Sequence, residues 1–215
     1  MARAVYHLIY EDNQTVFGGY MIEAGDGGYL LTGTKVIQFD PVEMGDITLI
    51  RTDVSGQVVW ENTWGGDVFD GANSIIQADD GNLVIAGKTR SNGAEGADSL
   101  LIKIDQDGNE IWSSVIGDTD MIDVGKVLAE TNDGGFVIAG ESGRDPYTWE
   151  ADMTLVKFYE NDQQLWEQTR VMNHSMLGDL LQYPDGGYVI SGSTYTGPVF
   201  NLFLIKTGLD GKLVS

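Results

Sequence analysis

A turn motif recurs four times along the 215-residue chain, and it restricts the possible folds more than any other feature. The copies read EAGDGGYLLTGT, QADDGNLVIAGKT, ETNDGGFVIAGES and QYPDGGYVISGST. Their turn aspartates, separated by 54, 53 and 52 residues, are Asp26, Asp80, Asp133 and Asp185. A second motif, DSLLIKIDQDGNEIW in its second copy, recurs at the same period; its copies begin at Asp46, Asp98, Asp152 and Asn201. The chain is therefore expected to contain four copies of one supersecondary unit.

Each copy divides into four short strands. In the second copy we expect strands over Asn73–Ala78, Leu83–Lys88, Ser99–Ile104 and Glu110–Ile116, the first two joined by the Asp80–Gly81 turn. Apolar residues nowhere follow the helical period for three turns, so helix should be nearly absent. Four-stranded units at a period of about 40–50 residues are typical of propeller blades. The predicted fold is all-β: a four-bladed β-propeller with four antiparallel strands in each blade.

Three residue types return at fixed places in the repeat and indicate structural roles. Glycine in the second strand predicts a close backbone approach at Gly33, Gly87, Gly140 and Gly192. Tryptophan in the fourth strand predicts packing between blades, with the ring N–H bonded to a backbone acceptor, at Trp60, Trp112 and Trp166. A cation in the third strand is expected beside carboxylates and is interpreted as structural, at Arg51, Lys103, Lys157 and Lys206.

The two ends of the sequence complement each other. Tyr6 precedes Asp26 by 20 residues, as Trp60 precedes Asp80, so Ala4–Tyr10 should be a fourth strand without a third strand before it. Leu202–Thr207 should be a third strand that lacks most of its fourth. Pairing these two segments would remove two exposed sheet edges and close the ring. The interpretation is one domain, 1–215, with blades at 18–64, 72–116, 125–171 and 178–215 plus 4–10.

Two alternatives to this closed monomer stay open. The same strand could be exchanged between two chains, which would give a dimer or an eight-bladed ring. The sequence could also belong to a larger protein with further blades.

The spacing D-x-x-G-x-x-x-W, as in Asp53, Gly56 and Trp60, resembles the tryptophan-docking repeat of quinoprotein-type propellers. The combined pattern DGG[YF]-x-[IL]-[AS]-G-x-[ST] then D-x-x-L-[IV]-K is similar to repeats of uncharacterised cell-surface and secreted propellers of archaea and bacteria. The third and fourth copies depart from the D-x-x-G-x-x-x-W spacing. Tyr159 and Asp162 replace its aspartate and glycine in the third copy, and the fourth copy has Gly208 and Ser215. The resemblance implies a propeller fold; it does not imply a quinone cofactor.

Charge and composition exclude several partners. With 12 basic and 33 acidic residues the net charge is −21, which argues against nucleic acid and anionic membranes as partners. No apolar run is long enough for membrane insertion, and there is no cysteine. The N-terminus lacks the order of a signal peptide, but an extracellular or cell-surface location is favoured by the resemblance.

A binding site is expected on the irregular loops, at the end of the propeller opposite the D-G-G turns. The candidate ligand-binding residues there are Arg144, Tyr147, Trp149 and Tyr195. The three aromatic rings could form a platform for a sugar or a peptide, or they could simply cap the blades. Arg144 could pair with an anion or form a plain surface ion pair.

No cofactor is expected, with calcium as the one candidate; in a chain with 33 acidic residues, clusters of carboxylates also arise by chance. Hard cations such as Ca²⁺ take six to eight oxygen ligands, and closely spaced carboxylates can supply them. The candidate ligands lie in two corresponding loops: Asp67 and Asp70 in one, and Asp118, Asp120 and Asp123 in the other.

No catalytic motif stands out, and the two histidines, His7 and His174, have no triad partners in sequence. The chain is therefore expected to be a non-catalytic binding scaffold for an unknown protein or glycan, and not an enzyme. The alternative is a small propeller hydrolase or lyase that acts on carbohydrate through loop carboxylates, since the separation of paired carboxylates is a property of the structure. A purely structural module in a larger assembly is a third interpretation.

Overall fold

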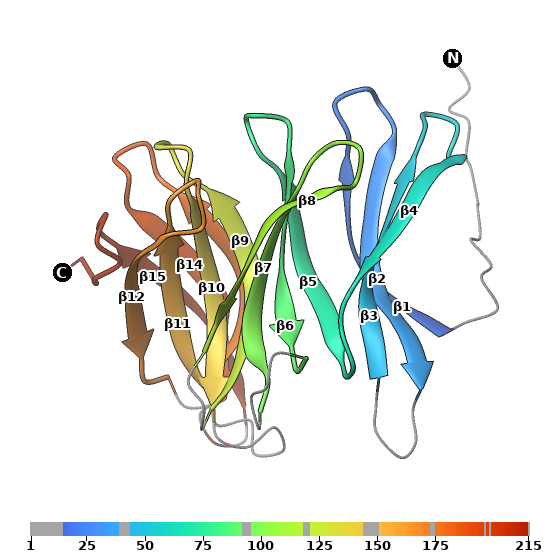
Figure 1. Cartoon of the computed structure of the whole chain (residues 1–215). Helices are drawn as coiled ribbons and strands as arrows, with labels where there is room; N and C mark the ends of the chain where they lie inside the picture. Colours follow the sequence, from blue (N-terminus) through green and yellow to red (C-terminus); the bar gives the residue numbers. More distant parts are fainter. Residues whose placement is uncertain are drawn as a thin grey trace.

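The computed structural model describes residues 15–38, 44–91, 96–117, 121–143, 151–172, 175–195, 197 and 199–214. These residues form fifteen β-strands and no helix, as the sequence predicts (Figure 1). Within this part of the chain there is accordingly no helix that could cross a membrane.

The strands form four antiparallel sheets, each made of consecutive strands. Blade 1 contains β1 (Thr15–Glu23), β2 (Tyr29–Gln38), β3 (Met44–Thr52) and β4 (Val58–Trp64). Blade 2 contains β5 (Asp70–Gln77), β6 (Leu83–Thr89), β7 (Asp98–Ile104) and β8 (Glu110–Ile116). Blade 3 contains β9 (Ile122–Glu130), β10 (Phe136–Gly143), β11 (Ala151–Phe158) and β12 (Gln164–Arg170). Blade 4 has three described strands, β13 (Ser175–Gln182), β14 (Tyr188–Tyr195) and β15 (Phe200–Thr207).

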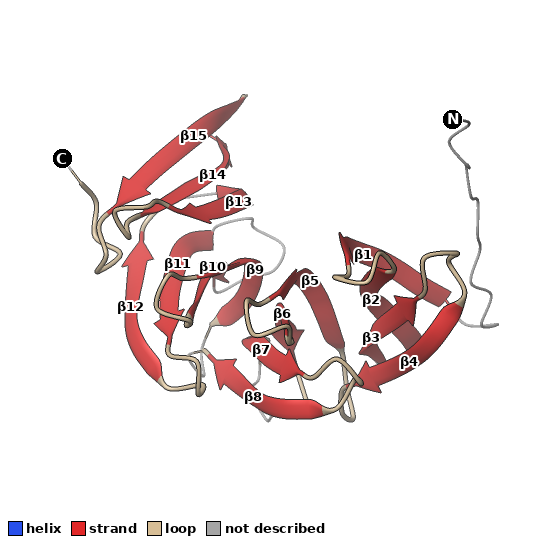
Figure 2. Ribbon diagram, turned by 90° about the horizontal axis from the view of Figure 1, so that it is seen from above, coloured by secondary structure: helices blue, strands red, loops and turns tan. Residues whose placement is uncertain are grey.

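The blades stand side by side along an arc, with the first strand of each on the inner side (Figure 2). In this view blade 4 and blade 1 lie at the two ends of the arc, with an opening between them. The closed ring of the sequence analysis is thus not seen. Its closing strand, Ala4–Tyr10, lies outside the described residues.

Three apolar cores join the blades, one at each joint. The first lies between blades 1 and 2 and contains Leu49 and Ile75. The second, between blades 2 and 3, contains Leu101 and Leu128, and the third, between blades 3 and 4, contains Leu155. Because the second strands of blades 2 and 3, β6 and β10, are buried on both faces, each of these blades contributes to two cores, and stability depends on the stacking of neighbours.

The repeated glycines meet the backbone of the first strand, as predicted. A Cβ on Gly87 would lie 2.1 Å from the carbonyl oxygen of Gly71, and one on Gly192 would lie 2.4 Å from that of Met176. The same close approach occurs in the other two blades. The contact follows from a bulge in each blade, such as that between Ala72 and Ser74, which pushes a carbonyl towards the second strand.

The tryptophans connect each blade to the next, which confirms their predicted role. Trp60 Nε1 donates a hydrogen bond to Gln106 O at 3.3 Å, and Trp112 Nε1 donates to Glu160 O at 3.1 Å. Both acceptors belong to the turn between the third and fourth strands of the following blade. Trp166 packs its ring edge-on against Tyr188 of blade 4.

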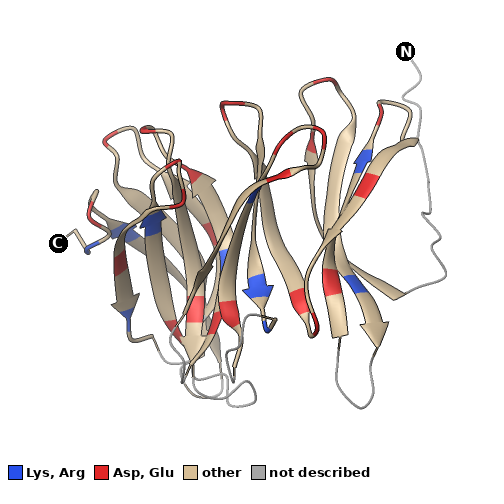
Figure 3. Cartoon of the chain, viewed as in Figure 1, with Lys and Arg blue, Asp and Glu red and all other residues tan. Residues whose placement is uncertain are grey.

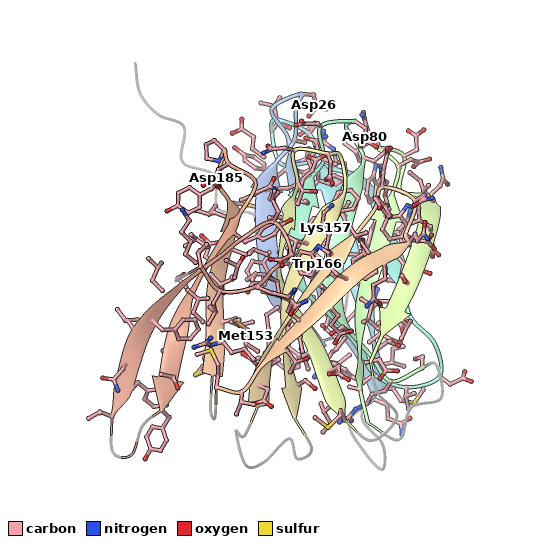
Figure 4. The ribbon with its side chains drawn as sticks, turned by 90° about the vertical axis from the view of Figure 1, so that its left-hand side faces the viewer. Asp26, Asp80, Met153, Lys157, Trp166 and Asp185 are labelled. Atoms are coloured by element: carbon pink, nitrogen blue, oxygen red, sulfur yellow. The ribbon has the colours of Figure 1, made fainter. Side chains whose placement is uncertain are left out.

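The repeated cations form ion pairs with the turn aspartates of their own blades. Lys103 Nζ lies 2.7 Å from Asp80 Oδ2, and Lys157 Nζ lies 2.9 Å from Asp133 Oδ1. Arg51 pairs with Asp26, and Lys206 lies 3.6 Å from Asp185. Asp26, Asp80 and Asp185 lie at the same end of the molecule (Figure 4), which we call the turn end. The structural interpretation of the cations is therefore correct.

Candidate active site

The other end, the loop end, carries the irregular connections, and acidic residues lie on the strands that reach it (Figure 3). Most of the predicted ligand-binding residues there fall outside the described residues: Arg144, Tyr147 and Trp149. Tyr195 is described. Its ring centroid lies 5.1 Å from that of Phe200, its cross-strand partner in the β14–β15 hairpin. This pairing gives Tyr195 a role in the hairpin, and the predicted platform stays untested.

The predicted calcium ligands do not gather into one described site. Asp118 and Asp120 lie outside the described residues, and Asp67 is exposed. Asp70 and Asp123 are buried at the starts of neighbouring first strands, in different joints. Among the described residues, no group of three or more histidine, aspartate or glutamate side chains could hold a metal ion.

The structure does bring Asp70 and Asp123 close to two other carboxylates. Each faces an aspartate near the start of the third strand of the preceding blade. Asp46 of β3 lies near Asp70, and Asp98 of β7 lies near Asp123. A glycine separates each pair. A Cβ on Gly117 would lie 2.4 Å from Asp98 Oδ1 and 2.9 Å from Asp123 Oδ2, so these two oxygens are at most 5.3 Å apart, the sum of both distances.

Asp46 and Asp98 lie on strands, and the sequence analysis expects site carboxylates in loops, so it does not predict these two residues. A signal was present, because an aspartate opens the second motif in three of its four copies. The role of this repeated aspartate depends on which residue of the next blade lies opposite it. In the third joint Asp152 Oδ1 accepts a hydrogen bond from the backbone N–H of Met172 at 3.1 Å, and no pair of this kind is described there.

Burial raises the pKa of Asp98, and the charge of Asp123 raises it further. Asp98 Oδ1 is buried and has no hydrogen-bond partner among the described residues. Asp123 is itself buried, and its backbone N–H donates to Ala97 O at 2.6 Å, which ties β9 to the loop before β7. Two carboxyl groups this close favour a state in which one keeps its proton while the other is ionised.

The pair in the first joint has different partners. Asp46 Oδ1 is also buried without a hydrogen-bond partner among the described residues. Burial and Asp70 raise the pKa of Asp46, but the positive charge of Lys35 lowers it. Asp70 Oδ2 accepts hydrogen bonds from Ser91 Oγ at 2.5 Å and from the backbone N–H of Gly66 at 2.9 Å. Asp98 has no cation among the described groups that influence its pKa.

The pair in the second joint borders a cleft. Asp123 lines an open cleft of about 320 Å³ between blades 2 and 3, together with Gly117. The cleft is largely polar. Its hydroxyl and carboxyl groups come from Ser99, Ser142, Thr154, Thr169 and Glu167. Asp123 is the member of the pair that reaches this cleft, and hydrogen-bonding side chains around a carboxyl group are a suitable environment for a polyhydroxylated ligand.

A second hollow, of about 400 Å³, lies between β1 and β5. Phe17, Tyr20 and Phe69 line it, and Lys88 Nζ lies 4.7 Å from the Phe69 ring centroid. The other blades have no aromatic residue at the position of Tyr20. Phe69 is buried, whereas Phe17 and Tyr20 are exposed and could stack on the apolar face of a ligand.

Comparison with known proteins supports the fold. No protein-family model and no curated protein sequence matches the chain. Among solved structures, the chain is similar to the α-L-arabinanase of Penicillium chrysogenum, solved with arabinobiose, at 14% identity and a TM-score of 0.58 over 95% of this chain. It is also similar to a variant of the α-L-arabinofuranosidase of Fusarium graminearum, solved with an iminosugar inhibitor, at 10% identity and a TM-score of 0.60 over 94% of this chain.

A third similar structure is the xylan β-1,4-xylosidase of Bacillus halodurans, with 15% identity, a TM-score of 0.51, and coverage of 90% of this chain and 41% of that one. The chain spans 65% of the length of the arabinanase and of the arabinofuranosidase. At these identities the likeness establishes the fold, which is that of a β-propeller.

These comparisons correct the functional expectation from the sequence. The sequence predicts a non-catalytic binding scaffold and not an enzyme, whereas the propellers that the chain resembles are glycoside hydrolases. The alternative expectation, a carbohydrate-active hydrolase with paired carboxylates, fits them better. The sequence failed here because the carboxyl groups that the fold brings together come from different blades and form no local motif.

Proposed function

We propose that this protein is a glycoside hydrolase that uses Asp98 and Asp123 as its catalytic pair. The observation that supports the proposal best is the position of these two carboxyl groups, at most 5.3 Å apart by the two distances to a Cβ on Gly117, beside the hydroxyl-lined cleft. The structural likeness to arabinan- and xylan-degrading enzymes supports the class of reaction.

The raised pKa of Asp98 suits it to the role of general acid. Asp98 would donate its proton to the glycosidic oxygen as the bond between that oxygen and the anomeric carbon breaks. Asp123, as the carboxylate, would attack the anomeric carbon and form a glycosyl ester. A water molecule that gives its proton to Asp98 would then hydrolyse the ester and restore both carboxyl groups.

Pentose-containing glycans are the proposed substrates, because the similar enzymes are named for arabinan, arabinofuranoside and xylan. Such polymers lie outside cells, and an extracellular or cell-surface location is proposed accordingly. The likeness to tryptophan-docking repeats also remains a proposal, supported by the hydrogen bonds that Trp60 and Trp112 donate to the following blades.

The test is hydrolysis of a panel of arabino- and xylo-oligosaccharides and aryl pentosides. Asp98→Asn and Asp123→Asn should each lower kcat by about 10²–10⁴-fold. Asp46→Asn is the matched control: it changes the equivalent residue of the first joint and should leave turnover within about twofold. Absence of turnover on the whole panel, or an equal loss in Asp46→Asn, would contradict the proposal.

A further inference from the structure

The two blades at the ends of the arc expose residues that every inner joint buries. In each joint a leucine of the third strand packs with an apolar residue of the next blade's first strand. The three pairs are Leu49 with Ile75, Leu101 with Leu128, and Leu155 with Leu180. All six residues are buried.

The strand registers identify the residues that would form the fourth pair. Leu204 pairs with Ser191 in the β-ladder as Leu101 pairs with Ala86, and each precedes the repeated cation by two residues. Met21 pairs with Leu31 as Ile75 pairs with Ile85. Leu204 is 71% exposed and Met21 is 62% exposed.

Further apolar residues are exposed beside Leu204 on blade 4 and beside Met21 on blade 1. On blade 4 Leu202, equivalent to the buried Met153, is 92% exposed, and Leu181 is 62% exposed. We call this surface, Leu181, Leu202 and Leu204, the forward face of blade 4. On blade 1 the equivalents of Ile75 and Leu83 are Met21 and Tyr29, and both are exposed. We call this surface, Met21 and Tyr29, the backward face of blade 1.

These faces complement one another, because the forward face has the residues with which a blade binds its successor and the backward face has those with which a blade binds its predecessor. Within the described part of the chain they do not meet (Figure 2). To meet within one chain, blades 1 and 4 would have to approach across the opening, and this would distort the three apolar cores that set the angle between blades.

A second copy of the chain can supply the missing face. We propose that two copies associate head to tail, with the forward face of blade 4 of each copy packed on the backward face of blade 1 of the other. In this pair the two joints are related by a twofold axis, as a closed head-to-tail assembly of two copies requires. Leu204 of one copy would lie against Met21 of the other.

The open edge of β15 fits the same arrangement. Leu213 forms a bridge with Thr207, and the N–H of Val214 donates to Lys206 O, so a fourth strand begins beside β15 at the turn end. The rest of the edge has no described partner strand. An unpaired strand edge beside the forward face favours association with another chain.

The test is the mass in solution, measured by sedimentation equilibrium and light scattering over a wide range of concentrations. The full chain should approach twice 23.4 kDa. Each copy carries a charge of −21, so added salt should tighten the association by screening the repulsion. Leu204→Asp and Met21→Asp should each raise the dissociation constant by about 100-fold or more.

Two controls distinguish disruption of the joint between copies from nonspecific effects of the aspartate substitutions. Val59→Asp changes an exposed apolar residue of the outer strand β4 and should leave the mass unchanged. A mixture of Leu204→Asp with Met21→Asp retains one unchanged joint in the mixed dimer and should associate more tightly than either variant alone. All three variants should keep the Tm of the monomer, since the replaced side chains are exposed within one copy.

Three outcomes would overturn the proposal. The first is a mass of one chain at every concentration together with a large fall in Tm for Leu204→Asp, which would show that the face is covered within the same chain. The second is a monomer with unchanged Tm in every variant. The third is a series of masses beyond two chains, which would show open head-to-tail polymers. None of these outcomes depends on catalysis, so the test of this inference is independent of the test of the proposed function.

Discussion

Lys157 Nζ lies 2.9 Å from Asp133 Oδ1, and this ion pair joins the third strand of blade 3 to the turn between its first two strands. The ammonium also donates to Thr131 Oγ1 at 2.8 Å and to Phe158 O at 2.9 Å. The same pair of residue types occurs in all four blades, always at the turn end. It is therefore part of the scaffold. Because the pKa of the turn aspartate is lowered in blades 1 to 3, at Asp26, Asp80 and Asp133, the stability of these blades depends on pH.

Asp133→Asn should lower the free energy of unfolding by about 1–2 kcal/mol at pH 7, because a buried ammonium loses its counter-charge; the value allows for the exposure of Asp133. Partial burial alone would raise the pKa of Asp133, but hydrogen bonds from Thr131, Lys157 and Gly135 lower it to about 2. A lowered folded-state pKa means that the stabilisation is full above the unfolded value of 3.8 and is lost as the pH falls towards 2.

Urea unfolding from pH 2 to pH 7 measures this difference between the wild type and Asp133→Asn. Asp185→Asn is the matched control, because its partner Lys206 is about half exposed and 3.6 Å away. Its effect should be no more than about 0.5 kcal/mol. Equal effects of both substitutions would contradict the importance of burial at Lys157.

Asp98→Asn should raise the stability of the protein at pH 7 by about 1 kcal/mol while it removes activity. The raised pKa of Asp98 means that its contribution to stability is present below pH 3.8 and is lost as the pH rises through the folded-state value. The neutral amide avoids that loss, so the gain should disappear in acid. Thermal unfolding at pH 3 and pH 7 measures this gain in stability. A variant that is less stable than the wild type at pH 7 would contradict a destabilising interaction between Asp98 and Asp123.

Asp46→Asn should give a smaller gain in the same experiment, since Lys35 already offsets part of the repulsion in the first joint. A larger gain in Asp46→Asn than in Asp98→Asn would show that Lys35 does not relieve the first pair.

Hydrolysis should proceed with retention of configuration at the anomeric carbon. The upper limit of 5.3 Å between the Asp98 and Asp123 oxygens, obtained from the two distances to a Cβ on Gly117, lies below the separation of about 6.5–9.5 Å found in inverting enzymes, which favours retention. The rate should fall as the pH rises above the raised pKa of Asp98, because the general acid then loses its proton. Proton NMR of the first-formed sugar decides the stereochemistry, and an inverted product would exclude this pair as acid and nucleophile.

Gly117→Ala should abolish turnover and lower the stability by about 1–3 kcal/mol. Its methyl group would enter the space between the two carboxyl groups, 2.4 Å from Asp98 Oδ1 and 2.9 Å from Asp123 Oδ2. Gly18→Ala is a suitable control, because no described atom lies within 4 Å of its added Cβ. Chemical denaturation and kcat measured on the same preparations test both effects; an active Gly117→Ala enzyme would place the reaction elsewhere.

Trp112→Phe should lower the stability by about 1 kcal/mol through loss of the hydrogen bond to Glu160 O. The phenyl ring retains most of the contact with the Phe136 ring, 6.2 Å away between centroids. Urea unfolding provides the value, and Trp112→Ala should be clearly more destabilising because the cavity adds to the lost bond. Equal effects of Phe and Ala would mean that ring packing contributes nothing to this joint.

The sequence by itself determined the elements and their order. Turn chemistry at Asp80–Gly81, period-two strands and the repeated Gly87, Trp112 and Lys103 are local or recur at a fixed period, so the residues alone are enough to interpret them. The strands expected at Leu83–Lys88 and Glu110–Ile116 are observed as Leu83–Thr89 and Glu110–Ile116. Such features depend on backbone conformation and on the nearest strand, and a sequence records both.

Only the tertiary structure decided which carboxyl groups meet and which apolar faces lack a partner. Asp98 and Asp123 are brought together by the angle between blades 2 and 3, and that angle results from the packing of a whole core. The exposure of Leu204 is of the same kind, since its sequence context matches that of the buried Leu49, Leu101 and Leu155. Whether such a residue is buried depends on the blade that packs against it, and the sequence of one repeat does not determine whether another blade packs there.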